Sequence, residues 1–174
     1  MGQSPSRSRS RLEQAKAGPT MSDRVSCPSA QPAQGAGMVI GVVVAQGGRS
    51  QVSLLPKSVP LRSVARLIPD AIPATEVLRL AAPCAERRCA HFSDDRCTLA
   101  SRIVARLPAV VDRLSPCALR PSCRWWRQEG PAACHRCPQI ITEPFRSSDL
   151  MREVATPTTT PAAQERSTGA SNHV

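Results

Sequence analysis

The chain has few of the residues that usually build a large hydrophobic core. It has 174 residues, with no tyrosine, two phenylalanines and two tryptophans, and it carries 17 prolines and 9 glycines. Aromatic side chains bury the most surface per residue, while proline and glycine interrupt helices and strands. A large, tightly packed core is therefore hard to assemble from this composition. We expect another source of stability besides apolar burial.

Lysine is almost absent, although the chain is strongly basic. Lys16 and Lys57 are the only lysines, and arginine supplies nearly all of the formal net charge of +10. A positive field of this size attracts polyanions such as nucleic acid, anionic lipid or an acidic protein. The densest basic run is the short RSRSR at 7–11. Such scattered charge is more typical of a solvated surface, so nucleic acid stays a weakly supported partner.

The chain also lacks a hydrophobic run long enough to cross a membrane. Its strongest apolar run is MVIGVVVA at 38–45, whereas a spanning helix needs about 20 residues. If translation began at Met21, this run could serve as the core of a signal peptide cleaved before Gln46. It is short for that role, and Gly41 interrupts it. The alternatives are a short β-strand or an unstructured extension. We expect a cytoplasmic protein without a membrane span, and export is the less favoured alternative.

Composition divides the chain into three parts. Residues 1–57 are predicted to be a disordered or weakly structured extension, and residues 147–174 a disordered tail. Most of both is rich in Ser, Pro, Ala and Thr and has no apolar period that would offset the entropy of ordering. Residues 58–146 between them are predicted to form a cysteine-rich, metal-binding helical domain.

Three stretches of this domain have helical patterns. LRSVARLI at 61–68 places apolar residues on one helix face. PATEVLRLAA at 73–82 has a possible N-cap at its threonine, and a third pattern runs from about Thr98 to a bend or break at Pro108. The predicted fold class is therefore mainly α, a small irregular, metal-stabilised helical domain with disordered N- and C-terminal tails.

Seven of the eight cysteines lie between residues 84 and 137. The motif CHRC at 134–137 can present two thiolates to one metal, and Cys117 and Cys123 would complete a four-coordinate site. Pro138 matches the Cys-Pro ending of ferredoxin-type cluster motifs. The earlier three cysteines would bind a second centre or supply ligands to the first. The predicted metal ligands are Cys84, Cys89, Cys97, Cys117, Cys123, Cys134 and Cys137.

Three chemistries can use clustered cysteines. Structural zinc sites usually combine two short knuckles, and this chain has one CxxC. Iron–sulfur clusters tolerate irregular gaps such as those here, so an iron–sulfur cluster is the favoured cofactor and zinc the alternative. Disulfides need an oxidising compartment, and seven cysteines leave one unpaired unless Cys27 joins. Disulfides are therefore the third alternative.

The other side chains of this segment point to packing rather than to catalysis. Trp125 and Trp126 are expected to pack around the site, where they could shield a cluster from water. His91 and His135 are as compatible with exposed polar positions as with metal binding. Ser101 has no base within sequence reach, and no Gly-rich phosphate loop is present. Enzymatic activity is therefore left open and is not favoured.

The stretch from Glu76 to Glu143 resembles a known group of sequences. Its most specific parts are CRWWRQEG at 123–130 and CHRCPQIIT at 134–142. These are similar to small cysteine-rich bacterial proteins, mainly cyanobacterial, that often carry a loose nitrogen-fixation label. The resemblance implies a cytoplasmic protein with a cluster-type metal site, and the label itself does not establish a reaction.

These observations lead to one functional expectation and one alternative. The chain is expected to bind an iron–sulfur cluster and to act in electron transfer or as an accessory to redox or metallocluster assembly. Its partner would then be a redox or cluster-assembly protein. The alternative is a zinc-stabilised module that binds nucleic acid or an acidic protein through its arginines.

Overall fold

The structure, a computed structural model, describes residues 24–34, 37–144 and 146–157. The basic run at 7–11, Met21 and the tail beyond residue 157 lie outside these ranges, so the predictions made for them are not addressed by the fold. None of the helices in the described ranges is both long enough and apolar enough to cross a bilayer.

The centre of the fold is a four-stranded antiparallel sheet with the strand order β1-β4-β2-β3. Strands β2 and β3 form a hairpin that turns at Gly47 and Gly48. Strand β4 pairs with the edge of β2 that faces away from β3. The short β1 pairs with the outer edge of β4. The strands are β1 Ser26–Cys27, β2 Met38–Gln46, β3 Arg49–Pro60 and β4 Leu78–Pro83.

The prediction of a mainly α fold is wrong, because the chain folds as a mixed α/β protein. Three of the four sheet strands come from residues 26–60. The run MVIGVVVA lies in β2, where its β-branched valines suit a pleated strand better than a helix. Within the predicted helix at 73–82, only Ala74–Val77 is helical, and LRLAA continues as β4. In this segment, hydrogen bonding of β4 to β1 on one edge and to β2 on the other outweighs the helix propensity of leucine and alanine.

Short helices and one small hairpin make up the rest of the described chain. The helix predicted from Thr98 is confirmed as α3, and it ends before Pro108. Part of the predicted tail forms α6. The α-helices are α1 Leu61–Val64, α2 Ala74–Val77, α3 Thr98–Arg106, α4 Arg124–Glu129, α5 Pro131–Cys134 and α6 Asp149–Ala155. The 3-10 turns are η1 Pro32–Gln34, η2 Ala65–Leu67, η3 Glu86–Arg88, η4 Arg120–Ser122 and η5 Cys137–Gln139, and the hairpin is β5 Phe92–Ser93 with β6 Arg96–Cys97.

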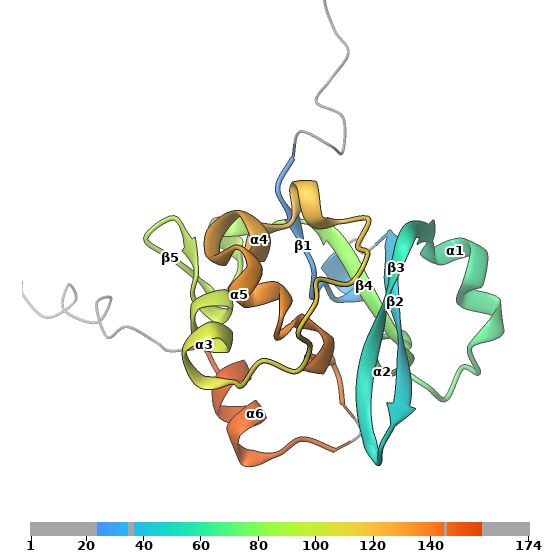
Figure 1. Ribbon diagram of the computed structural model, residues 1–174. Coiled ribbons are helices and arrows are strands. Elements are labelled where there is room, and N and C mark those ends of the chain that lie inside the picture. Colours follow the sequence, from blue (N-terminus) through green and yellow to red (C-terminus); the bar gives the residue numbers. More distant parts are fainter. Residues whose placement is uncertain (1–23, 35–36, 145, 158–174) are drawn as a thin grey trace, which may run out of the picture.

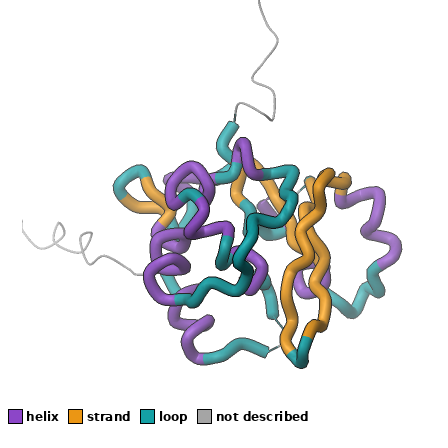
Figure 2. Tube along the Cα trace, in the orientation of Figure 1, coloured by secondary structure: helices purple, strands orange, loops and turns teal. Residues whose placement is uncertain are grey.

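The sheet separates two hydrophobic clusters. Side chains alternate between the faces of a strand, so Leu80 and Ala82 face one side of β4 while Ala81 faces the other. Leu80 and Ala82 pack with the residues of α1. Ala81 belongs to the larger cluster, which contains Ile103 of α3 and Trp125 of α4. Figures 1 and 2 show helices α3 to α6 gathered on one side of the sheet and α1 on the opposite side. All but one of the cysteines come from outside the sheet strands, and most belong to this helical side.

Replacing Gly41 with alanine is expected to lower the free energy of unfolding by about 1–3 kcal/mol. A Cβ atom at Gly41 would lie 2.5 Å from Cγ1 of Val52 and 3.0 Å from the carbonyl oxygen of Ser53. Both contacts are too close, and one of them is to backbone, so β2 and β3 would have to separate. Urea unfolding followed by circular dichroism measures the loss. The control is Ala45→Ser at an exposed position of β2, and an equal effect of the two substitutions would contradict the packing argument.

Candidate four-cysteine metal site

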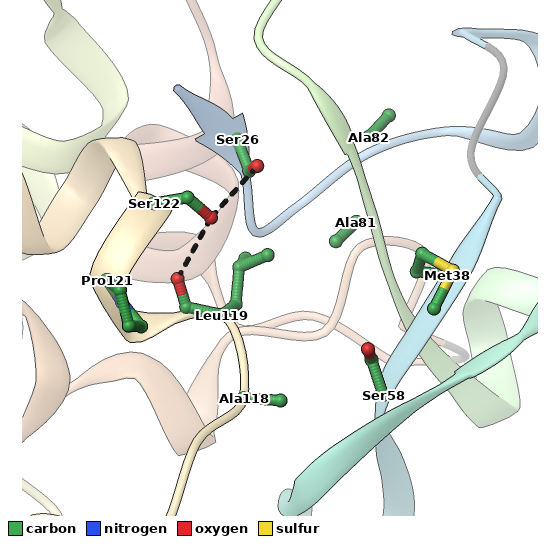
Figure 3. A pocket seen from close by; sticks show the side chains of 9 residues that line it. All are labelled: Ser26, Met38, Ser58, Ala81, Ala82, Ala118, Leu119, Pro121 and Ser122. Atoms are coloured by element: carbon green, nitrogen blue, oxygen red, sulfur yellow. Dashed lines mark hydrogen bonds between the residues drawn. The ribbon is translucent and has the colours of Figure 1, made fainter. Parts of the chain in front are cut away.

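One hollow in the described structure has no ionisable side chain in its lining. It has a volume of about 320 Å³ and lies between the sheet and the segment 118–122. Figure 3 shows alanines 81 and 82 on one side and Ser122, which donates a hydrogen bond to the Ser26 hydroxyl, on the other. With no acid, base or thiol in its lining, this hollow offers no group for acid–base or nucleophilic chemistry.

The second hollow is a small apolar cavity that is lined by four cysteines. These are Cys117, Cys123, Cys134 and Cys137, the set predicted from the sequence to hold the first metal centre. The rest of its wall comes from β2, β3, α4, α5, the start of η4 and the loop after β1, and it includes Pro28, Ile40, Leu54, Leu119, Arg120, Trp125 and Ala133. The cavity volume is about 20 Å³, close to the space that one water molecule or one ion occupies. Four cysteines therefore line one small hydrophobic space.

Helix ends place three of these cysteines at the cavity. Cys123 precedes the first turn of α4, and its sulfur accepts hydrogen bonds from the backbone N–H groups of Trp125 and Trp126. Cys134 is the last residue of α5, and Cys137 is the first residue of η5. Gly130, with φ of +59°, connects α4 to α5 in a conformation that a side chain would strain. The sharp turn at this glycine brings the CHRC motif back toward Cys123.

Burial favours the protonated thiol at Cys123, Cys134 and Cys137 by raising the pKa of each. Desolvation raises the pKa of Cys123 to about 12 and that of Cys137 to about 11, and the neighbouring cysteines raise both further. Burial also raises the pKa of Cys134, although the Arg120 guanidinium beside it opposes this shift. A nucleophilic cysteine needs a lowered pKa, so these thiols are poorly suited to covalent catalysis. A metal ion would have to displace their protons on binding.

A second sulfur group lies across Trp125 from the first. Burial raises the pKa of Cys27 to about 11, and electrostatic repulsion from Cys84 and Cys97 adds to this shift. The backbone N–H of Cys84 donates to the carbonyl of Val25, next to β1, at 2.8 Å. Cys97 ends β6, and its sulfur accepts a hydrogen bond from the Trp125 side chain. Cys27, which the sequence prediction left out of the ligand set, is thus the third member of this group.

Cys89, which the sequence prediction included, does not line the four-cysteine cavity. It ends the η3 turn, and its sulfur accepts a hydrogen bond of 3.4 Å from the backbone N–H of His91. Cys97 is instead fixed by Gln128 of α4. The Gln128 amide accepts from the Cys97 N–H at 2.8 Å and donates to the Cys97 carbonyl at 3.0 Å. This two-point contact ties the second group to the helix that carries Trp125.

The site does not have the geometry of a closed metal centre as it stands. Across the described ranges, no group of three or more His, Cys, Asp or Glu side chains lies close enough to enclose a metal ion. The donor set nevertheless suits a soft metal, since four sulfurs line one water-poor cavity. Binding would require the thiols to move inward while the surrounding apolar residues stay packed.

Among the described residues, His91, His135 and the two tryptophans take part in structural contacts. The Nδ1 atom of His135 lies 2.8 Å from the carbonyl oxygen of Val111, and that of His91 lies 3.0 Å from Arg102. Burial, and then the positive Arg102, lower the pKa of His91. Trp125 is 2% exposed, and Trp126 is half-buried under the Arg120 guanidinium. This packing leaves little of either indole for stacking on nucleic-acid bases.

Two arginines at this site were not identified from the sequence. Arg79 is fully buried in β4, and Arg120 lines the cavity. A signal for Arg79 was present, since a charged residue stands inside the apolar run LRLAA. Arg120 had no distinguishing signal among the many arginines. Comparisons of the chain with protein-family models, with curated proteins and with solved structures gave no match.

Proposed function

We propose that the chain binds a metal centre through Cys117, Cys123, Cys134 and Cys137, and that this centre is an iron–sulfur cluster. The observation that carries the proposal is the cavity that these four cysteines line. Four sulfur ligands complete the coordination of a cluster, and an apolar surrounding protects it from water. The irregular cysteine spacing and the Cys-Pro ending favour a cluster over a zinc knuckle.

The proposed role is electron transfer or assistance to redox or metallocluster assembly. Two observations support this role: the hollow of about 320 Å³ has no acid, base or thiol in its lining, and burial raises the pKa values of Cys123 and Cys137. A binding or redox role therefore fits better than hydrolytic or acyl-transfer catalysis. The partner in this proposal is a redox or cluster-assembly protein.

A single zinc ion is the second candidate, and one observation favours it. The cavity volume of about 20 Å³ suits one ion, whereas a cluster would require the surrounding segments to move further apart. Zinc bound by four thiolates would be structural, because no coordination position would remain open. In this case the protein would be a zinc-stabilised binding module for an acidic protein or for nucleic acid.

Anaerobic purification followed by visible absorption and metal analysis tests these proposals. We expect a brown protein that contains iron and acid-labile sulfide. A colourless protein with stoichiometric zinc would select the second candidate. If the thiols were recovered as disulfides without metal, both proposals would be wrong.

The double substitution Cys134→Ser/Cys137→Ser is expected to abolish metal binding, because serine is a poor ligand for soft metals. Cys89→Ser is the matched control, since Cys89 is a half-buried cysteine that does not line the four-cysteine cavity. It should keep the full metal content. Metal analysis of the three purified proteins measures the difference. Unchanged metal in the double variant would remove the CHRC motif from the site.

A further inference from the structure

Three arginines of the described chain lie over aromatic rings. Arg120 lines the four-cysteine cavity, and Arg79 contacts two residues of its wall, Trp125 and Pro28. The guanidinium carbons lie 5.2 Å from the ring centre for Arg79 over Trp125 and 5.5 Å for Arg120 over Trp126. Arg124 lies 5.2 Å from the Phe92 ring, and its charge is matched by Glu86 at 2.5 Å. The ion pairs among the described residues include neither Arg79 nor Arg120. The two arginines at the cavity thus have no carboxylate counter-charge in the described structure.

Arg79 is the more unusual of the two because it is only 1% exposed. Side chains alternate between the two faces of β4, so Arg79 lies on the same face as Ala81. This face is turned toward the helical side of the molecule. Its Nε atom donates to the carbonyl of Pro28 and its Nη1 atom to the carbonyl of Ile140, while Nη2 is buried without a partner. Carbonyl groups satisfy hydrogen bonds but do not neutralise the charge. Burying an unpaired charge is costly, so this position calls for a nearby anion.

Arg120 approaches the cavity from the opposite wall. Its side chain is hydrogen-bonded to the sulfur of Cys134, and its Nη2 atom donates to the carbonyl of Ser115. Its Nε atom is buried without a partner. Arg79, in turn, is close enough to Cys137 to act on it electrostatically. Arg120 therefore contacts Cys134, while Arg79 acts electrostatically on Cys137 of the same set and also on Cys27.

We infer that Arg79 and Arg120 are the counter-cations of the four-cysteine site, and that the site is built for a centre of net negative charge. The inference rests on the proposed function, because the anion it requires is the thiolate-bound metal centre. Four thiolates around a dication, or around a cluster core of the same charge, carry a net charge of about −2. The two guanidiniums supply an equal positive charge. A site lined by neutral thiols alone would leave both arginines uncompensated.

The arginines act as positioning residues rather than as ligands. Each would stabilise the loaded state more than the stripped state, because the centre gains negative charge only when thiolates replace thiols. Positive charge and hydrogen bonds near cluster sulfurs also raise the reduction potential. Removal of one arginine should therefore weaken metal binding and shift the potential of the reconstituted cluster to a more negative value.

The experiment titrates Co²⁺ into the stripped full-length protein and follows the visible absorption of thiolate-bound cobalt. Arg79→Met and Arg120→Met are each expected to weaken Co²⁺ binding by roughly tenfold or more. Arg79→Lys and Arg120→Lys keep the charge and should remain within a few-fold of wild type. Arg66→Met, at an exposed position in η2, is the matched control and should bind like wild type. The second readout is the midpoint potential of the cluster after anaerobic reconstitution. It is measured in wild type, Arg79→Met and Arg120→Met.

The possible results separate the inference from the proposed function. If wild type binds neither Co²⁺ nor iron, the proposed function is wrong and the inference fails with it. If wild type binds metal and both methionine variants bind it equally well with the same potential, only the inference is wrong. Lysine variants as weak as the methionine variants would also overturn it, because packing rather than charge would then matter. Arg120 lies partly at the surface, so its variants keep the test valid if Arg79→Met does not fold.

Discussion

Trp125→Ala is expected to lower the free energy of unfolding by about 3–5 kcal/mol, a large share of the stability of an ordinary domain. Trp125 is among the largest fully buried side chains in the described structure. Its ring packs in the cluster of α3, α4 and α5, lies under the Arg79 guanidinium and lines the four-cysteine cavity. With so few aromatic residues in the chain, no neighbouring large side chain can fill the space that alanine would leave.

Two further variants separate the contributions of this tryptophan. Trp125→Phe keeps most of the volume but removes the N–H that bonds to Cys97, so a smaller loss of about 1–2 kcal/mol is expected. Trp126→Ala is the matched control, because Trp126 is adjacent and only half-buried. Urea unfolding of the three variants, followed by circular dichroism, measures the losses. If Trp126→Ala were as destabilising as Trp125→Ala, the core would not be centred on Trp125.

The sequence predicted local features better than pairing between distant segments. The amphipathic pattern from Thr98 and the stop near Pro108 depend on neighbouring residues, and α3 follows them. The sheet depends on contacts between β4 and two strands that are more than 30 residues away in the chain. Nothing in the local pattern of LRLAA indicates those partners. For the same reason, α6 was missed in a polar segment, where Val154 is buried against the α3 side of the core.

The candidate site shows a similar division. Four of the predicted cysteines line one cavity, and their proximity follows from short spacing along the chain. The second group was predicted from spacing as Cys84, Cys89 and Cys97, and the sheet adds Cys27, which is close enough to Cys84 and Cys97 to interact with them electrostatically. Cys27 is more than 50 residues away from Cys84 in sequence, so only strand pairing reveals the contact. The buried charge of Arg79 likewise depends on its strand face, which requires the register of β4.

Removing the metal from the wild-type protein is expected to lower its melting temperature by roughly 10 °C or more. Metal binding to structural thiolate sites contributes several kcal/mol of apparent stability, and each kcal/mol shifts the melting temperature of such a domain by about 2–4 °C. Helices α4 and α5 have six and four residues, too short to be stable without tertiary contacts. A centre bound between Cys123 and Cys137 would join both helices and η5 to one point.

Calorimetry under anaerobic conditions measures this effect. It compares the loaded protein, the chelator-stripped protein and the stripped protein after metal is restored. The Cys134→Ser/Cys137→Ser variant is the control, and its melting temperature should not respond to metal. Hydrogen exchange should locate the change, with lost protection in residues 117–140 and retained protection in the β2–β3 hairpin, whose ladder does not involve the thiols. Equal melting temperatures with and without bound metal would show that the centre does not hold these short helices together.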